Sequence, residues 1–436
     1  MHVHDFVAVG VGPFNLGLAC LTEPLDLDGV FLEARPEFDW HPGMLLEDAS
    51  LQVPFLADLV TMADPTSAYS FLNFLKDTGR LYSFYIRESF YPLRREYNDY
   101  CRWAADRLSS LRFGQRVDRV EHDGAVYMVH TSTDEVFASR RLVLGVGSIP
   151  AVPTSALPLL EDSGQRAGTG RVALHTADYL QHRDTLRSLA SVTVVGSGQS
   201  AAEVYADLLG TVEPGQALNW VTRSPRFYPM EYTKLTLEMT SPEYTAYFQA
   251  LPESTRGELL REQKALYKGI SSDLVNQIFD QLYEKRVCGG VDATLVTSSE
   301  LVAARADGRS YVLELHHLES GESFAMRTDG VVLATGYTTE VPGFLDPVRD
   351  RINWDDRGRF VASSSFAVDV WDAEIFVQNA EEHTHGFVAP DLGMGAHRNA
   401  TVIAAMLGRE VYPIEKRVAF QHFGVPDHLR VLQQSQ

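Results

Sequence analysis

The chain opens with Asp5-Phe6-Val7-Ala8-Val9-Gly10-Val11-Gly12-Pro13-Phe14-Asn15, an apolar run that ends in two closely spaced glycines. The run up to Val9 has the apolar, β-branched character of a buried strand. Residues 13–20 follow as a helix start, and residues 30–33 predict a second strand. Strand, glycine turn, helix and strand within about 30 residues form one βαβ unit, so an α/β fold with parallel strands is expected.

This first turn has the chemistry of a nucleotide-binding loop. Gly10 permits the tight turn, and Gly12 lets the backbone approach a pyrophosphate at the N-terminus of the helix, where free N–H groups lie. Asn15 stands at the position of the third glycine in the usual fingerprint. Glu33 follows Gly10 by 23 residues, where an acid accepts hydrogen bonds from the ribose hydroxyls of an adenosine. A plain strand-to-helix turn is the alternative, but the place of Glu33 favours a dinucleotide site.

A second βαβ unit follows near the middle of the chain. Residues 191–195 predict a strand, residues 196–201 a Gly-Ser-Gly-Gln-Ser-Ala turn, residues 201–209 a helix, and residues 219–223 the next strand. This last strand ends in Arg223 instead of an acid, and an arginine can pair with a 2′-phosphate that an acid would repel. The second site is therefore predicted to take NADP(H); the alternative is an arginine that is merely solvated on a loop.

Two dinucleotide sites without a Cys-x-x-Cys pair or a metal box indicate a flavoprotein reduced by NADPH, with FAD at the first site. The predicted fold class is α/β, with two Rossmann-like dinucleotide-binding domains and a small helical substrate-pocket region. Apolar strands closed by glycine and then proline, within residues 141–153 and 329–342, suit crossings between the domains. The predicted limits are 1–165 for the first part of the FAD-binding domain, 166–230 with 285–325 for the inserted NADPH-binding domain, 231–284 for the helical region, and 326–436 for the second part of the FAD-binding domain and the C-terminal tail.

Composition limits the class of partner. The 436 residues are 45% hydrophobic and 22% charged, which is typical of a globular protein, and the net charge is −20. This negative charge disfavours nucleic acid and anionic membrane surfaces and mildly favours cationic small molecules. The three cysteines are too widely spaced for a disulfide framework, and the sequence has neither a membrane-length apolar run nor the basic start of a signal peptide. A cytoplasmic location is expected.

Several stretches, taken in order along nearly the whole chain, make the sequence resemble the N-hydroxylating flavin monooxygenases. This family includes the lysine N6- and ornithine N5-hydroxylases and the diamine N-hydroxylases of hydroxamate siderophore biosynthesis. The Trp-His-Pro-Gly-Met stretch at residues 40–44 is more specific than either glycine turn. The stretches that carry the resemblance are residues 9–16, 38–44, 51–56, 196–201, 334–337 and 384–386.

The resemblance implies a set of cofactor-binding residues and a homo-oligomer, either a tetramer or a dimer. Gln52 would lie near the reactive edge of the flavin, and Asp391 and Leu392 close to its ring system. The residues implied for FAD are Gly10, Gly12, Pro13, Phe14, Asn15, Glu33, Trp40 and His41. Those implied for NADPH are Gly196, Ser197, Gly198, Gln199, Ser200 and Arg223.

One departure from the family pattern bears on the substrate. In the amino-acid hydroxylases of this family a lysine commonly follows the Phe-Leu pair and meets the substrate carboxylate, whereas Ala57 follows that pair here. A methyl group cannot balance a buried carboxylate, and a buried anion without a partner is costly. An acid such as Glu231 could instead receive a second ammonium, so a diamine, cadaverine or putrescine, is predicted. The alternative is L-lysine or L-ornithine, with a cation such as Lys234 or Lys268 covering the carboxylate.

The hypothesis for the mechanism is that NADPH reduces FAD, and that a C4a-hydroperoxide formed with O2 passes oxygen to the neutral amine. A dry pocket would lower the pKa of the amine from about 10.4. Rival classes are a Baeyer–Villiger or sulfur oxygenase, an NADPH oxidase, and a flavoprotein redox sensor; residues 40–44 and the intact second turn count against them. His383 and His385 are expected to line the flavin pocket or to have a role in a loop, and not to hold a metal. Arg94 is expected to be solvated or paired.

Overall fold

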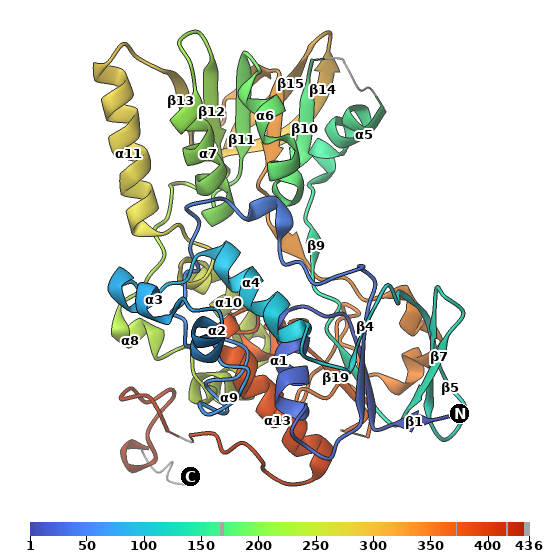
Figure 1. The fold of residues 1–436 in the computed structure, drawn as a ribbon. Helices are drawn as coiled ribbons and strands as arrows, with labels where there is room; N and C mark the ends of the chain where they lie inside the picture. The colour runs from blue at the N-terminus through green and yellow to red at the C-terminus, as the bar shows by residue number, and fades with distance from the viewer. Residues whose placement is uncertain (166–169, 372, 416, 431–436) are drawn as a thin grey trace, which may run out of the picture.

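The computed structural model describes residues 1–165, 170–371, 373–415 and 417–430. They form two units, one above the other, with the middle of the chain in the upper unit and both ends in the lower one (Figure 1). A parallel five-stranded sheet lies in each unit. The predicted α/β class with two Rossmann-like units is confirmed.

The lower sheet has the strand order β19-β8-β2-β3-β4. Its central strand is fully buried and runs into the glycine turn, after which the first helix begins with Pro13, whose missing N–H costs nothing at that position. The predicted first βαβ unit is therefore present. The strands are β2 (Phe6–Val9), β3 (Gly29–Glu33), β4 (Leu111–Phe113), β8 (Leu142–Leu144) and β19 (Ile375–Val377).

Helices cover this sheet and bury the largest apolar core of the molecule. Two of them, α4 and α13, pack against α1, and side chains of α2, α3 and α4 add an aromatic cluster that includes Phe71, Phe74 and Tyr100. The helices are α1 (Pro13–Thr22), α2 (Phe71–Asp77), α3 (Leu81–Arg87), α4 (Arg94–Ala105) and α13 (Gly395–Leu407). A second sheet of the lower unit, ordered β1-β7-β6-β5, comprises β1 (Val3–His4), β5 (Val117–His122), β6 (Tyr127–Thr131) and β7 (Val136–Ser139).

The upper sheet has the order β10-β17-β11-β12-β13. The predicted second βαβ unit is present as β11, α7 and β12, although β12 ends at Val221, so that Arg223 lies just beyond the strand. The parallel strands are β10 (Val172–His175), β11 (Ser191–Val195), β12 (Ala217–Val221), β13 (Asp292–Val296) and β17 (Gly330–Leu333). The helices are α5 (Leu157–Gln165), α6 (Tyr179–Arg187), α7 (Gln199–Thr211) and α11 (Ser272–Val287), and an antiparallel sheet comprises β14 (Ser299–Asp307), β15 (Ser310–His317) and β16 (Ser323–Thr328).

The chain crosses between the units where glycine and proline follow two strands. The short strands β9 (Ile149–Pro150) and β18 (Tyr337–Thr338) pair antiparallel there, and β9 is visible between the units in Figure 1. Below them, two short helices of the middle segment, α9 (Pro242–Ala250) and α10 (Glu253–Glu262), pack against α12 (Glu382–His385) of the lower unit. The same segment also contains α8 (Lys234–Leu237).

The sheets divide the chain differently from the predicted limits at two boundaries. Strand β17 was placed with the segment 326–436 of the lower unit, but it pairs with β10 and β11 in the upper sheet. Helix α11 was placed mainly in the helical region 231–284, but its Ile278 joins the apolar core under α7. Both errors have the same cause. The apolar residues of a strand or a helix face show that it will be buried, but they do not specify in which apolar core. Within the described ranges, no helix is long and apolar enough to cross a membrane.

Candidate active site

The first glycine turn combines one crowded and one open position. Gly10 has a φ of +87°, and a Cβ there would lie 2.4 Å from the carbonyl oxygen of Gly145, so only glycine fits. At Gly12 a Cβ would meet nothing within 4 Å. The backbone is thus tight on its inner side and free on its outer side, at the N-terminus of α1. This cradle fits the pyrophosphate of a dinucleotide such as FAD.

Glu33 lies beside this turn, as its spacing predicted. Its carboxylate accepts hydrogen bonds from the backbone N–H of Val11 (2.7 Å) and from the backbone N–H of Arg35 (3.0 Å). Oε1 of Glu33 also accepts a hydrogen bond from Nε of Arg35 (3.1 Å). The acid is therefore fixed against the loop, and an unused lone pair remains on Oε2. It lies where the ribose of a bound adenosine would be expected.

Asn15 lies behind the turn and is 1% exposed. Its amide nitrogen donates to the carbonyl oxygen of Gly10 (2.7 Å), and its amide oxygen accepts from Gln378 (2.8 Å). Gln378 also donates to Asn399, which in turn donates to the carbonyl oxygen of Phe14 (3.0 Å). These bonds hold the loop from inside the protein, so the side chain of Asn15 acts on the shape of the turn rather than pointing outward.

The second glycine turn repeats the crowded position. Gly196 has a φ of +151°, and a Cβ there would lie 2.1 Å from the carbonyl oxygen of Ala334. The indole N–H of Trp220 donates to the carbonyl oxygen of Gly196 (2.8 Å). Arg223 is exposed at the carboxyl end of β12. The turn residues Ser197, Gly198, Gln199 and Ser200 are partly exposed at the start of α7.

A series of side-chain hydrogen bonds connects the lower unit to the upper unit. The amide nitrogen of Gln52 donates to Gln199 (2.9 Å), whose own amide nitrogen donates to Glu203 (2.8 Å). Glu203 forms a two-pronged ion pair with Arg94 of α4, both contacts measuring 2.7 Å. We call Gln52, Gln199, Glu203 and Arg94 the inter-unit network. It brings together two residues that the sequence analysis had assigned separately, one to the flavin and one to NADPH.

Arg94 is paired, as expected, but no sequence pattern indicates its partner. Glu203 lies 109 residues further along the chain, and the two side chains are 13% and 6% exposed. A helix-start arginine and a mid-helix glutamate are common in any sequence. Their meeting follows only from the docking of α4 against the start of α7.

The Trp-His-Pro-Gly-Met stretch lies at the junction of the units. The ring of His41 lies 5.0 Å from that of Trp40 and 5.4 Å from that of Tyr337 in β18. A Cβ at Gly43 would lie 1.8 Å from the carbonyl oxygen of Ala177 in the upper unit. Gly43 is therefore required for the close approach of the two units, a role that the sequence analysis did not assign.

Ala57 and residues 391–393 meet in the lower unit. Ala57 is buried, and a Cβ built on Gly393 would lie 3.7 Å from its methyl group. Asp391 accepts a hydrogen bond from the backbone N–H of Gly393 (2.7 Å), which fixes the loop that carries Leu392. Burial raises the pKa of the Asp391 carboxyl. The two expected site segments are thus adjacent.

Glu231 is exposed on the segment that faces this loop. Its backbone N–H donates to the carbonyl oxygen of Ala265 (3.2 Å). Burial, with smaller contributions from Tyr91 and the Asp391 carboxylate, raises the pKa of the neighbouring Tyr232. Tyr232, next to Glu231 in the sequence, therefore lies in surroundings that are both aromatic and acidic.

The two lysines considered as partners of a substrate carboxylate differ in their surroundings. Lys268 places its Nζ 3.6 Å from the carboxylate of Glu382 and 4.6 Å from the ring centre of Tyr267. The hydroxyl of Tyr267 donates to the same carboxylate. Lys234 is exposed at the start of α8. The charge of Lys268 is thus already balanced within the protein.

A buried ion pair lies behind the first turn and was not foreseen. Arg398 of α13 and Glu381 are fully buried and 2.9 Å apart, and the guanidinium of Arg398 lies 4.6 Å from the ring centre of Phe14. Burial raises the pKa of Glu381, while the charge of Arg398 opposes this rise. The pair supports the helix that begins at the first turn, and no motif in the sequence marks it.

His383 and His385 lie in the short helix α12 instead of a loop, and both contact neighbouring residues. His383 is hydrogen-bonded to the carbonyl oxygen of Phe360 (2.7 Å), and the ring of His385 stacks on that of Phe366 at 4.5 Å. Burial lowers the pKa of His385 to about 3. Neither histidine belongs to a three-ligand cluster within the part of the chain that the structure describes.

Comparison with known proteins agrees with this geometry. Residues 2–339 match the family described as L-lysine 6-monooxygenase/L-ornithine 5-monooxygenase. The putrescine N-hydroxylase of Shewanella oneidensis is 47% identical over 97% of this chain and 84% of its own length.

Solved structures show the same relationship. DfoA, the cadaverine monooxygenase of the desferrioxamine pathway of Erwinia amylovora, solved with FAD bound, is 49% identical, with a TM-score of 0.93 over 98% of this chain and 99% of its own. The ornithine N-hydroxylase of Kutzneria sp. 744, in complex with reduced FAD, NADP+ and L-ornithine, is 27% identical, with a TM-score of 0.84 over 93% and 99%.

Proposed function

Because the chain belongs to the L-lysine 6-monooxygenase/L-ornithine 5-monooxygenase family, we propose that it hydroxylates one primary amine of an aliphatic diamine, cadaverine or putrescine. The reaction uses FAD, NADPH and O2. The relatives named for putrescine and cadaverine share almost half of their residues with this chain, whereas the ornithine N-hydroxylase shares about a quarter. The product would be an N-hydroxydiamine for a hydroxamate siderophore.

The observation that carries the choice of substrate is the environment of Ala57. A buried methyl group stands where the family's amino-acid hydroxylases commonly carry a lysine, and the carboxyl group of Asp391 lies beside the adjacent Gly393. We infer that Glu231 supplies a second acidic group to the substrate. Lys268 lies 3.6 Å from the carboxylate of Glu382, an acidic partner within the protein. The α-carboxylate of an amino-acid substrate would therefore meet acidic groups and no cation, and would be repelled. The second ammonium of a diamine would be attracted by the same groups.

We assign the cofactors to the two glycine turns. Gly10, Gly12, Pro13 and Phe14 would hold FAD with Glu33 at its ribose, supported from behind by Asn15. Trp40, His41 and Gln52 would line the flavin, with Asp391 and Leu392 beside its ring system. The second turn would hold NADPH, with Arg223 at the 2′-phosphate. Bound FAD supplies the redox chemistry, with NADPH as reductant and O2 as oxidant.

The protein's own residues have three tasks in this reaction: to hold the cofactors, to position the amine, and to exclude water. A dry pocket disfavours the ammonium form of the substrate, so the reacting nitrogen becomes neutral and nucleophilic. The inter-unit network ties Gln52 to the start of α7 and so fixes one nucleotide site relative to the other. A dimer or tetramer and a cytoplasmic location also belong to the proposal.

The substrate assignment is tested by measuring the hydroxylamine product, not NADPH loss alone, with cadaverine, putrescine, L-lysine and L-ornithine. We expect kcat/KM for the better diamine to exceed that for either amino acid by at least about 30-fold, the equivalent of about 2 kcal/mol for an unpaired buried charge. A higher kcat/KM with L-lysine or L-ornithine would overturn the diamine assignment and support the amino-acid alternative.

Two variants at position 57 sharpen this test. Ala57→Lys should reduce diamine turnover and raise kcat/KM for an amino acid roughly tenfold, because it supplies the missing cation. Ala57→Met adds comparable length without charge and should reduce diamine turnover without improving the amino acids. If both variants respond alike, the effect is one of volume, and the charge argument is wrong.

A further inference from the structure

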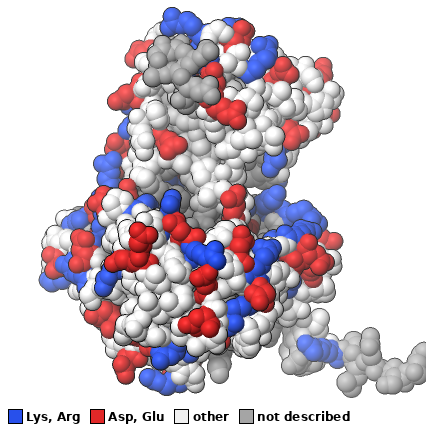
Figure 2. Space-filling model, turned by 90° about the vertical axis from the view of Figure 1, so that its right-hand side faces the viewer, with Lys and Arg blue, Asp and Glu red and all other residues white. Residues whose placement is uncertain are grey.

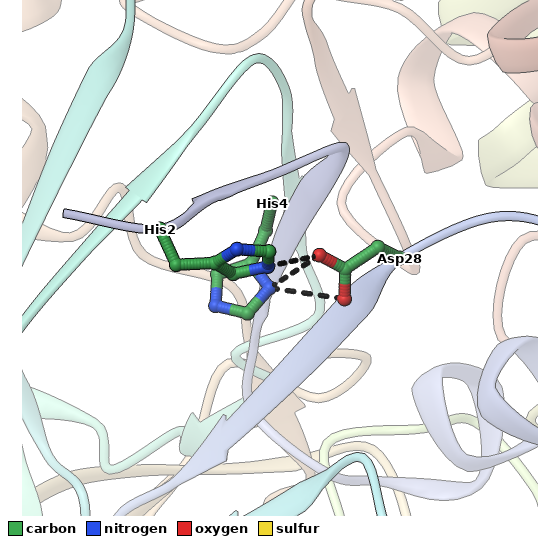
Figure 3. Close-up of side chains that lie close together, drawn as sticks. All are labelled: His2, His4 and Asp28. Carbon is green, nitrogen blue, oxygen red and sulfur yellow. Dashed lines mark hydrogen bonds and ion pairs between the residues drawn. The ribbon is translucent and has the colours of Figure 1, made fainter.

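A cluster of three metal-ligating side chains lies at the start of the chain. His2 places its Nε2 2.5 Å from one carboxylate oxygen of Asp28, and His4 places its Nδ1 3.1 Å from both oxygens (Figure 3). The centres of the two imidazole rings are 4.6 Å apart. The three ligand atoms lie within 4.8 Å of one another, and no other such group occurs within the described ranges.

The backbone fixes this arrangement in advance. His2 and His4 are two residues apart on an extended segment, so their side chains leave the same face, and His4 is held by the pairing of β1 with β7. Asp28 is held by its neighbours: its N–H donates to the carboxylate of Asp5 (3.1 Å), and its carbonyl oxygen accepts from the N–H of Asp5 (2.8 Å). Little conformational entropy would be lost on closing the three side chains around an ion.

We propose that His2, His4 and Asp28 form a binding site for a first-row divalent cation of the Zn²⁺ class. Two imidazoles and one carboxylate are a donor set that such ions accept, with water completing the shell. Ligand atoms at about 2.0–2.2 Å from a tetrahedral Zn²⁺ lie about 3.3 Å apart. The contacts of His4 with Asp28 (3.1 Å) are close to this spacing, and the contact of His2 (2.5 Å) would lengthen on binding. Small side-chain rotations therefore convert the cluster into a coordination sphere.

The site is open to the solvent from which an ion would come. The side chains of His2 and Asp28 are 70% and 47% exposed, whereas that of His4 is 18% exposed and provides a fixed inner ligand. Acidic side chains are spread over both units on the face shown in Figure 2. The net charge of −20 raises the local concentration of cations around the protein.

The position of the cluster separates this function from the hydroxylation site. The N-terminus lies at the outer edge of the lower unit, away from the crossing strands between the units (Figure 1). An ion there would join β1 to the turn that precedes β3 and would stabilise the edge of the lower unit. It would take no part in the oxidation of the amine.

The experiment is equilibrium dialysis of the FAD-loaded protein against Zn²⁺ alone, combined with thermal unfolding. The wild type is expected to bind one more Zn²⁺ per chain than the double variant His2→Gln/His4→Gln, and Asp28→Asn should weaken that site by at least about tenfold. Zn²⁺ at 100 times the dissociation constant should raise the Tm of the wild type by about 2 °C or more and leave that of the double variant unchanged.

A matched control uses the other exposed histidine–carboxylate pair of the lower unit. Glu121 and His130 are 3.4 Å apart but offer two ligands only, so Glu121→Gln should leave Zn²⁺ binding at the wild-type level. FAD content and amine-dependent turnover report that each variant is folded. Equal Zn²⁺ stoichiometry and affinity in the wild type and the double variant would overturn the proposal, because the ions would then occupy other groups such as the exposed Cys288.

Discussion

The two glycine turns share the same backbone arrangement but differ in the charged residue that would distinguish one bound nucleotide from another. Each begins with a glycine at positive φ whose Cβ would collide with a carbonyl oxygen of a neighbouring strand, that of Gly145 behind Gly10 and that of Ala334 behind Gly196. The charged residue near the carboxyl end of the second strand of each unit differs: Glu33, the last residue of β3, is fixed against the loop, whereas Arg223, just beyond β12, is exposed. The scaffold is thus set by steric exclusion, and the choice of nucleotide by one charge.

The third fingerprint position also differs between the turns. Ala201 in the second turn is a small, buried residue that permits close packing of helix and strand. Asn15 in the first turn fills the same kind of space with an amide that is bonded to Gly10 and Gln378. The first turn therefore depends on a polar network that reaches the C-terminal part of the chain. The second depends on the apolar packing of Ala201 together with the hydrogen bond from Trp220 to Gly196.

The largest effect is expected from two single substitutions, one in each turn, at the crowded positions Gly10 and Gly196. Gly10→Ala should abolish stable FAD binding, and Gly196→Ala should leave FAD bound but weaken NADPH roughly a hundredfold, because each Cβ displaces one turn. Visible absorbance reports FAD, and KM reports NADPH. If Gly10→Ala protein retained its full yellow colour, the assignment of FAD to the first turn would be wrong.

A smaller effect is expected at the ion pair that links the units. Glu203→Gln leaves the largely buried guanidinium of Arg94 without its charge partner and should lower the free energy of unfolding by about 3 kcal/mol, measured by urea titration. Glu47→Gln, which breaks an exposed pair with Arg183, is the control and should change stability by about 1 kcal/mol or less. Equal losses in the two variants would mean that the inter-unit network adds no stability beyond an ordinary surface contact.

The smallest effect is expected at Arg223, whose positive charge distinguishes the second nucleotide site from the first, where Glu33 is negative. Arg223→Ala should raise KM for NADPH roughly tenfold while leaving KM for NADH unchanged, because it removes one charge-assisted contact with a phosphate. Arg226→Ala is the matched control, since the guanidinium of Arg226 lies over the ring of Tyr228 at 4.4 Å. An unchanged preference for NADPH in Arg223→Ala would remove its assigned role.

Both βαβ units were predictable because each is formed by residues that are close together in the sequence. An apolar run, a glycine that must adopt positive φ, and a helix start occupy fewer than about 20 residues, so local sterics and hydrogen bonding specify them. The crossing between the units was predictable for the same reason, from glycine and proline after each strand. The sequence did not indicate that β17 and α11 belong to the upper unit, because an apolar face can pack against any apolar core.

By itself the sequence determined the fold class, the two turns and the charged residue that follows each unit, since these depend on neighbours along the chain. The tertiary structure alone decided which distant groups meet: Glu203 with Arg94, Glu381 with Arg398, Gly43 against Ala177, and Ala57 beside Gly393. Each of these contacts joins residues more than a helix length apart, and it exists because packing of the cores, not any local preference, fixes the distance between them.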